Sequence, residues 1–129
     1  MDLALATGRG ETLLTQWPGI VGPLVEDHAV VQLGERESRD VDFAWPDIAQ
    51  TAITQIDVFA ANASGPEKIL AKINATLDAA RQQFWIHFDV DVLDKAVMPA
   101  VDSPVAQALS HSGLNISVPG CCKTRCAAV

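Results

Sequence analysis

Residues 84–91, with the sequence FWIHFDVD, decide the fold. The stretch is almost continuously apolar as far as Val90, so a strand formed by it would have no face suited to water. Strands of this kind belong to parallel sheets that are covered on both faces. Asp89 and Asp91 come where the strand is expected to end. The stretch therefore predicts a buried parallel strand that brings two carboxylates to its carboxyl end.

An amphipathic helix is predicted directly before this strand, at residues 65–80. Ser64 can cap its first turn, Pro66 is favoured at the start of a helix, and Glu67 provides a capping-box carboxylate. The apolar side chains of the helix recur every three or four positions, at Ile69, Ile73, Leu77 and Ala80. A helix with one apolar stripe, followed by an apolar strand, indicates an α/β arrangement.

Two shorter apolar runs extend this pattern toward the N-terminus, at residues 29–34 and 54–59. Both contain the β-branched and aliphatic residues that are typical of strands. Because crossover connections between successive parallel strands are right-handed, we predict that these two runs and residues 84–89 are neighbouring parallel strands. The predicted helix would then pack on one face of the sheet, which gives an α/β fold.

Composition restricts the possible partners. The chain has 129 residues, enough for one domain, and 49% of them are hydrophobic, so a packed core is feasible. The net charge of -7 argues against a nucleic-acid or anionic-membrane partner. No basic start followed by a long apolar run is present, and no apolar stretch approaches the ~20 residues of a membrane-spanning helix. We therefore expect a soluble, cytoplasmic protein.

The cysteines gather at one end of the chain. Cys121, Cys122 and Cys126 are the only three, and all lie in the last nine residues. An odd number in such a cluster does not make a disulfide framework, and a zinc site would need four regularly spaced ligands. We interpret these residues as free thiols on a frayed terminal segment.

Asp89 and Asp91 are the strongest candidates for chemistry. Two residues apart on a strand, their side chains would point to the same face, at the edge where α/β sheets bind ligands. Two close carboxylates repel each other unless a cation lies between them, and oxygen ligands suit manganese or magnesium. Aspartates at strand ends also cap helices or bind nothing, so the spacing leaves metal binding and a structural role equally open.

The other polar candidates are given structural interpretations. His87 would share the face of Asp89, but a single histidine in an apolar strand is more often a core residue, and we favour that role. His28 and His111 lie in loop-like stretches that give no ligand geometry. The charged residues at 35–40 are expected to form a solvated loop.

Motifs along the chain resemble those of the arginase (ureohydrolase) family, which includes arginases, agmatinases and formiminoglutamases. The segment FDVDVLD at residues 88–94, followed by Met-Pro-Ala at 98–100 and Ser-Pro at 103–104, is similar to the aspartate motif of the family. Residues 1–10 resemble the stretch after its second metal motif. Residues 30–40 resemble its central strand and following loop. The resemblance runs in order from residue 1 to about residue 104.

The resemblance implies a three-layer α/β/α fold with a parallel sheet, incomplete here. It implies a manganese-dependent hydrolase that cleaves guanidino or formimino C–N bonds of a small molecule, with arginine to ornithine and urea as the lead reaction. Family members use two Mn²⁺ ions and are often homo-oligomers. Asp89 and Asp91 would be metal ligands, with Asp89 as the bridge between the ions, and Asp94 would orient the loop. The resemblance identifies no further catalytic residue in this chain.

The departures from the family pattern are equally specific. The Gly-Gly-Asp-His and Asp-Ala-His-x-Asp segments that carry the remaining ligands are absent, so the complete metal site is not encoded. Lys95 stands where a proline is expected. After Pro104 the expected Pro-Gly-Gly-Leu is replaced by VAQAL, and residues 105–129 are predicted to be a divergent C-terminal tail. We therefore expect the C-terminal part of an arginase-like domain at residues 1–104, inactive by itself.

Three alternatives stay open at this point. The chain could be a truncated product with no catalytic role. An apolar strand followed by Asp-x-Asp also opens haloacid-dehalogenase-type phosphatases, with Asp89 as nucleophile, although Val92 and Leu93 depart from that pattern. A shifted reading frame after Pro104 would explain the tail. Sequencing the coding DNA tests the shift, since no Pro-Gly-Gly in another frame would exclude it.

Overall fold

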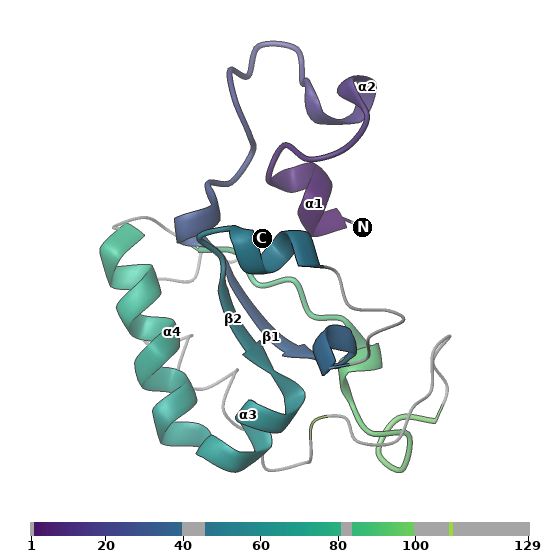
Figure 1. Ribbon diagram of the computed structural model, residues 1–129, viewed down its shortest axis with the longest axis vertical. Helices are drawn as coiled ribbons and strands as arrows, with labels where there is room; N and C mark the ends of the chain where they lie inside the picture. Colours follow the sequence, from purple (N-terminus) through teal and green to yellow (C-terminus); the bar gives the residue numbers. More distant parts are fainter. Residues whose placement is uncertain (1, 40–45, 81–83, 100–108, 110–129) are drawn as a thin grey trace.

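The computed structural model describes residues 2–39, 46–80, 84–99 and 109 (Figure 1). The described part contains α-helices and strands in the order α1 (Asp2–Ala6), α2 (Thr12–Thr15), β1 (Val31–Glu35), β2 (Thr54–Asp57), α3 (Val58–Ser64) and α4 (Pro66–Ala80). Short 3₁₀ helices connect them: η1 (Asp27–Ala29), η2 (Glu37–Arg39), η3 (Pro46–Gln50) and η4 (Val90–Val92). The predicted tail lies outside the described residues, apart from Leu109.

The two strands form a parallel pair. Val31 is in register with Thr54, and Leu33 with Ile56. A hydrogen bond of 3.0 Å from the Thr54 amide to the Val30 carbonyl starts the ladder. The prediction that the runs at 29–34 and 54–59 are neighbouring parallel strands is confirmed for their central residues, and the fold is α/β.

The register shifts at Gly34, between Leu33 and Glu35. Gly34 is buried and has a φ of 89°, which only glycine adopts without strain. A Cβ atom at this position would overlap the side chain of Val92 and crowd that of Leu109. The absence of a side chain at Gly34 therefore lets η4 lie directly against β1.

Strand β2 ends earlier than predicted because Asp57 begins a helix. Its side chain accepts a hydrogen bond of 2.6 Å from the Ala60 amide and so caps α3. Val58 and Phe59, predicted to continue the strand, are instead the first two residues of α3, and Val58 is completely buried. Local capping by an aspartate has overridden the β propensity of a valine and a phenylalanine.

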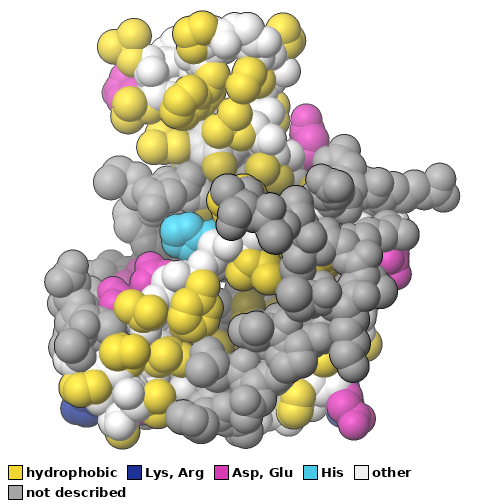
Figure 2. Space-filling model, turned by 180° about the vertical axis from the view of Figure 1, so that it is seen from behind, with side chains coloured by type: hydrophobic (Ala, Val, Ile, Leu, Met, Phe, Trp, Pro, Cys, Tyr) yellow, Lys and Arg dark blue, Asp and Glu magenta, His cyan; other side chains and the backbone are white. Residues whose placement is uncertain are grey.

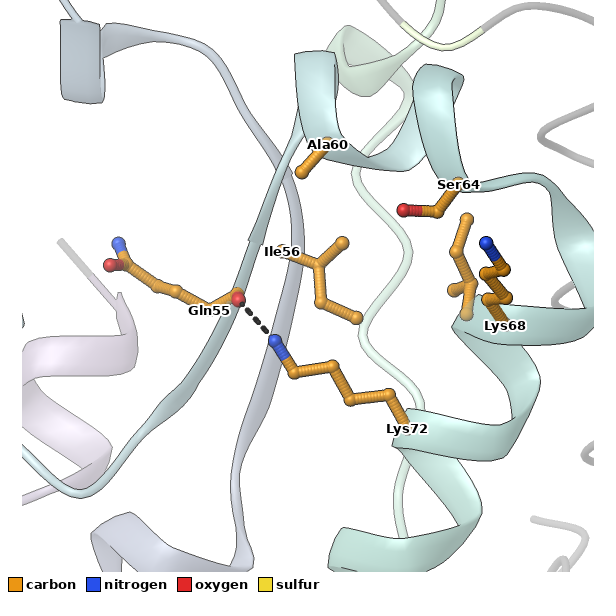
Figure 3. Close-up of a pocket in the computed structure, with 7 residues that line it drawn as sticks. Gln55, Ile56, Ala60, Ser64, Lys68 and Lys72 are labelled. Atoms are coloured by element: carbon orange, nitrogen blue, oxygen red, sulfur yellow. Dashed lines mark hydrogen bonds between the residues drawn. The ribbon is translucent and has the colours of Figure 1, made fainter.

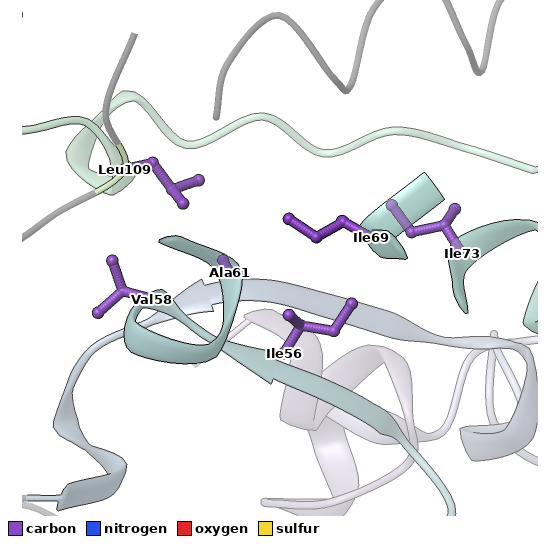
Figure 4. Close-up of a cluster of buried hydrophobic side chains, with 6 residues drawn as sticks. All are labelled: Ile56, Val58, Ala61, Ile69, Ile73 and Leu109. Atoms are coloured by element: carbon purple, nitrogen blue, oxygen red, sulfur yellow. The ribbon is translucent and has the colours of Figure 1, made fainter. Parts of the chain in front are cut away.

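The core lies between the sheet and the two following helices (Figure 4). Its buried residues are Ile56, Val58, Ala61, Ile69, Ile73 and Leu109. The helix predicted at 65–80 is confirmed as α4, with Ile69 and Ile73 buried and Leu77 packed against the cluster. Burying one such aliphatic side chain contributes ~1.5–3 kcal/mol, so these contacts help to hold α3 and α4 against the sheet.

The prediction of a buried strand at residues 84–89 is wrong in this structure. Phe84 packs against the core, but residues 85–89 belong to no strand. Trp85 is 75% exposed and Phe88 49% exposed. The segment runs as irregular chain into η4 (Figure 1). Phe84 makes an isolated bridge, and residues 85–89 belong to no strand, so an apolar composition did not by itself produce a strand here.

Candidate metal centre

The two candidate ligands lie at the start of η4. Asp89 has extended backbone angles, and its side chain accepts a hydrogen bond of 3.0 Å from the Asp91 amide, so Asp89 caps this short helix. Asp89 is exposed and Asp91 is half-buried. Because residues 90–92 form a 3₁₀ turn, the two-residue period of a strand does not relate these side chains as predicted. The capping hydrogen bond joins the Asp89 carboxylate to the backbone of Asp91, and not to its side chain.

Arg36 fixes this segment against the sheet. It directly follows β1, and its Nη1 donates a hydrogen bond to the backbone carbonyl of Asp91. The carboxyl end of β1 therefore lies beside η4. Gly34 has no side chain, so Val92 of η4 can pack closely against β1. Ligands of α/β proteins bind at the carboxyl ends of parallel strands. The aspartate pair is thus found at the edge where the sequence predicted chemistry, although not at the end of a strand of its own.

Asp94 holds the turn that follows. Its side chain accepts a hydrogen bond of 2.9 Å from the Ala96 amide, and its carbonyl accepts one of 2.8 Å from the Val97 amide. The preceding residue, Leu93, is buried and forms a parallel bridge with Leu109. The orienting role predicted for Asp94 agrees with these contacts.

The arginines at 36 and 39 are not merely part of a solvated loop. Arg39 lies 3.2 Å from the Asp57 carboxylate and 4.2 Å above the centre of the Phe59 ring. Burial of Asp57 acts to raise its pKa, but hydrogen bonds from the Ala60 amide and Arg39 outweigh this effect and lower the pKa. Arg36 and Arg39 thus connect the loop after β1 to two different parts of the fold, and no motif reasoning identified either role.

Glu35, the last residue of β1, is a further carboxylate at this end of the sheet. One of its oxygens, Oε1, accepts a hydrogen bond from the Glu37 amide. The other, Oε2, is buried and has no hydrogen-bond partner among the described residues. Sequence reasoning treated Glu35 as part of the charged loop.

The described residues offer few ligands for a metal ion. Within the described ranges, no group of three or more His, Cys, Asp or Glu side chains is arranged to hold an ion. His87 and His28 are exposed, so the core role favoured for His87 is not found. His111, Cys121, Cys122 and Cys126 lie outside the described residues. Asp89 and Asp91 offer carboxylate oxygens, which suit manganese. Two such residues are too few to complete a metal site.

A shallow hollow of about 170 Å³ lies elsewhere, between β2 and α4 (Figure 3). Its lining residues are Gln55, Ile56, Ala60, Ser64, Lys68, Ile69 and Lys72. The ammonium of Lys72 donates a hydrogen bond of 3.2 Å to the Gln55 carbonyl at the outer edge of β2. The hollow contains no carboxylate and is separate from the aspartate pair, so it plays no part in the candidate centre.

Comparison with known proteins decides the family. The model of the arginase family matches residues 12–124, which is most of the chain. The chain belongs to the arginase family. The matched range passes residue 104 and includes Leu109, which packs in the core. The division into a domain at residues 1–104 and a tail stays a prediction.

A solved structure agrees with this assignment. The crystal structure of an arginase from Bacillus subtilis matches with a TM-score of 0.75 and 25% sequence identity. The match covers 88% of this chain and 38% of that chain, so the chain spans well under half of the length of the arginase. Comparison with curated protein sequences gives no match. In the described part of the chain, no helix has the length and hydrophobicity needed to cross a membrane.

Proposed function

We propose that this arginase-family chain carries part of a manganese centre for the hydrolysis of guanidino or formimino C–N bonds, with Asp89 and Asp91 as ligands. The observation that supports it most is the position of this pair. The two residues stand within the family match, beside the carboxyl end of β1, and Arg36 holds their backbone there. Arginine, cleaved to ornithine and urea, is the lead substrate.

The two aspartates have separate tasks in this proposal. Both provide hard carboxylate oxygens, the atoms that Mn²⁺ prefers. Asp89, which is the more exposed of the two, is proposed as the bridge between two ions. Manganese, when bound, would activate water and stabilise negative charge as the guanidino carbon is attacked. Arg36 binds a neutral carbonyl and leaves the Asp91 carboxylate available for the ion.

We further propose that the chain is inactive by itself. Two carboxylates provide only part of the ligand set of a binuclear centre, and the 129 residues contain neither the Gly-Gly-Asp-His nor the Asp-Ala-His-x-Asp segment. An ion held by so few protein ligands keeps most of its water and binds weakly. A non-catalytic role is therefore the main alternative for this chain. Membership of the arginase family leaves the phosphatase alternative without support.

The remaining assignments are proposals of the same kind. Agmatine and formiminoglutamate are alternative substrates, because the residues that would select among them are not identified in this chain. A cytoplasmic location agrees with the acidic composition and with the absence of a spanning helix among the described residues. We propose no nucleic-acid or membrane partner, and a homo-oligomeric state.

A Mn²⁺ titration tests the ligand assignment. The parent chain, an Asp89→Ala/Asp91→Ala variant and a Glu67→Ala/Asp78→Ala control would be compared by the electron paramagnetic resonance signal of free Mn²⁺. The control removes two exposed carboxylates from α4, so the net charge changes equally in both variants. We expect weak binding by the parent and control, and at least a ~10-fold loss for the first variant. Equal binding by all three proteins would refute the assignment.

A further inference from the structure

Strand β2 has an outer edge, on the side away from β1. The Thr54 amide donates a hydrogen bond to the Val30 carbonyl and so points toward β1. Because the backbone groups of successive strand residues point to opposite sides, the amide and carbonyl of Gln55 point away from β1. Among the described strands, β2 pairs with β1 alone. The outer edge therefore presents backbone donors and acceptors to which another strand could bond.

Lys72 occupies the Gln55 acceptor on this edge. Its ammonium extends from α4 and donates a hydrogen bond of 3.2 Å to the Gln55 carbonyl (Figure 3). One turn later on α4, the Thr76 hydroxyl lies 3.1 Å from the Thr54 hydroxyl. These contacts hold α4 to two successive residues of β2 and keep Lys72 within reach of the edge. The ammonium is therefore placed where the amide of an added strand would donate its hydrogen bond.

A lysine makes this position unfavourable for an incoming strand. Lys72 is exposed, so the remaining donors of its ammonium stay in water. A strand that paired with β2 would displace the ammonium from the carbonyl and hold it beside its own backbone, away from water, where an unpaired charge is unfavourable. Lysines on the exposed edges of natural sheets act against strand pairing in this way.

Lys68 provides an internal comparison on the same helix. It lies one turn before Lys72, is also exposed, and lines the same hollow between β2 and α4. Within the described part of the chain, Lys68 makes no hydrogen bond or ion pair, whereas Lys72 bonds to the strand. The two lysines have the same charge and the same helical setting, so contact with the edge of β2 is what distinguishes them.

We propose that Lys72 closes the outer edge of β2 against the addition of another strand, and so keeps copies of the chain from aggregating edge to edge. The lysine acts by occupying the Gln55 carbonyl and by placing a charge beside it. The proposal does not depend on the metal assignment, because Lys72 and Gln55 lie in α4 and β2 and not in η4.

Thioflavin T fluorescence during incubation tests this role. Lys72→Met keeps a long side chain but removes the donor, and Lys68→Met makes the same change beside the edge. Each substitution makes the net charge of -7 more negative by one, so general repulsion is matched. We expect Lys72→Met to assemble about 2- to 10-fold faster than Lys68→Met, the factor that corresponds to one net hydrogen bond, and Lys72→Arg to behave like the parent.

The rates would be compared under conditions in which urea unfolding gives both methionine variants the same stability. Equal rates for Lys72→Met and Lys68→Met, or no assembly by either, would overturn the proposal.

Exposed apolar side chains elsewhere are the main competing cause of assembly. Figure 2 shows hydrophobic side chains gathered over the lobe that projects between α1 and η1, and the exposed residues of this segment include Leu13 and Val21. This surface is unchanged in both lysine variants, so it contributes equally to their rates. A difference between the two variants therefore reports on the edge of β2.

A second substitution identifies the edge directly. Gln55→Pro removes the backbone N–H that points away from β1 and leaves the bonds to β1 in place, as proline is tolerated at such edge positions. Added to Lys72→Met, it should return assembly to the rate of the parent, because an incoming strand loses an edge donor. A double variant that unfolds cooperatively in urea, yet assembles as fast as Lys72→Met, would show that another surface is responsible and would overturn the proposal.

Discussion

Arg36 donates a hydrogen bond from its guanidinium to the backbone carbonyl of Asp91, 55 positions later in the chain. The bond joins the loop after β1 to the segment that carries both candidate metal ligands. Since the acceptor is a carbonyl, Arg36 positions the segment without forming an ion pair with its carboxylates.

Replacing Arg36 should therefore weaken metal binding. We expect Arg36→Ala to lower the affinity for Mn²⁺ by ~10-fold, because residues that orient ligands typically have effects of this size. Arg36→Lys keeps one donor and should restore part of the loss. Arg39→Ala is the matched control, since Arg39 contacts Asp57 and Phe59 instead. Equal losses for Arg36→Ala and Arg39→Ala would show that the effect is general instability.

Gly34→Ala should destabilise the fold by about 2–4 kcal/mol, because it combines an unfavourable positive φ with overlap against Val92. Gly22→Ala is the control for backbone strain: its φ is also 89°, but an added Cβ would meet nothing within 4 Å. We expect that control to lose only ~1–2 kcal/mol. Urea denaturation measures both free energies of unfolding. If the two variants lose the same amount, close packing of η4 on β1 is not important.

Asp57 should make the fold sensitive to acid. Its pKa is lowered from the ordinary 3.8, despite burial, by the Ala60 amide and Arg39. A carboxyl with a lower pKa in the folded state stabilises above the unfolded value, and this contribution is lost as pH falls through the folded pKa. Asn can still cap α3, but it has no negative charge to pair with Arg39. Asp57→Asn should therefore be less stable than the parent near neutral pH.

The difference in stability between the parent and Asp57→Asn should become smaller when the pH falls below the ordinary aspartate pKa. Thermal unfolding over a pH series measures it, and subtraction removes contributions from other carboxyls such as Asp27, whose pKa Arg9 also lowers. Asp78→Asn, at an exposed position on α4, is expected to differ little from the parent at any pH. A constant difference between the parent and Asp57→Asn would contradict the assigned role.

Local signals explain which elements could be predicted. The stripe of Ile69 and Ile73 behind Pro66 predicted α4 because spacing and start signal agree within one short segment. Asp57 carried an N-cap signal that the β-branched residues around it obscured, so β2 was predicted two residues too long. Residues 85–89 show the reverse problem, since their apolar composition predicted a strand, whereas the structure places them in irregular chain after the bridge residue Phe84.

The candidate site was predictable to a similar degree. The motif around Asp89 and Asp91 made this pair the candidate, and its role as a metal site stays a proposal; the orienting role expected of Asp94 agrees with its hydrogen bond to the Ala96 amide. Gly34 could have been recognised, because a glycine inside a strand often marks a bulge or a close approach. The role of Arg36 could not have been recognised, since nothing in the local sequence indicates that its side chain reaches a carbonyl 55 residues away.

Whether the aspartate pair suffices for hydrolysis is tested most directly by urea release from arginine with excess Mn²⁺. The parent chain would be compared with the Asp89→Ala/Asp91→Ala variant at equal concentration. We expect the parent to release no more urea than the variant, because the described residues offer only part of a binuclear ligand set. Turnover by the parent that the double substitution abolishes would contradict this expectation, and would show that the chain contains a working centre.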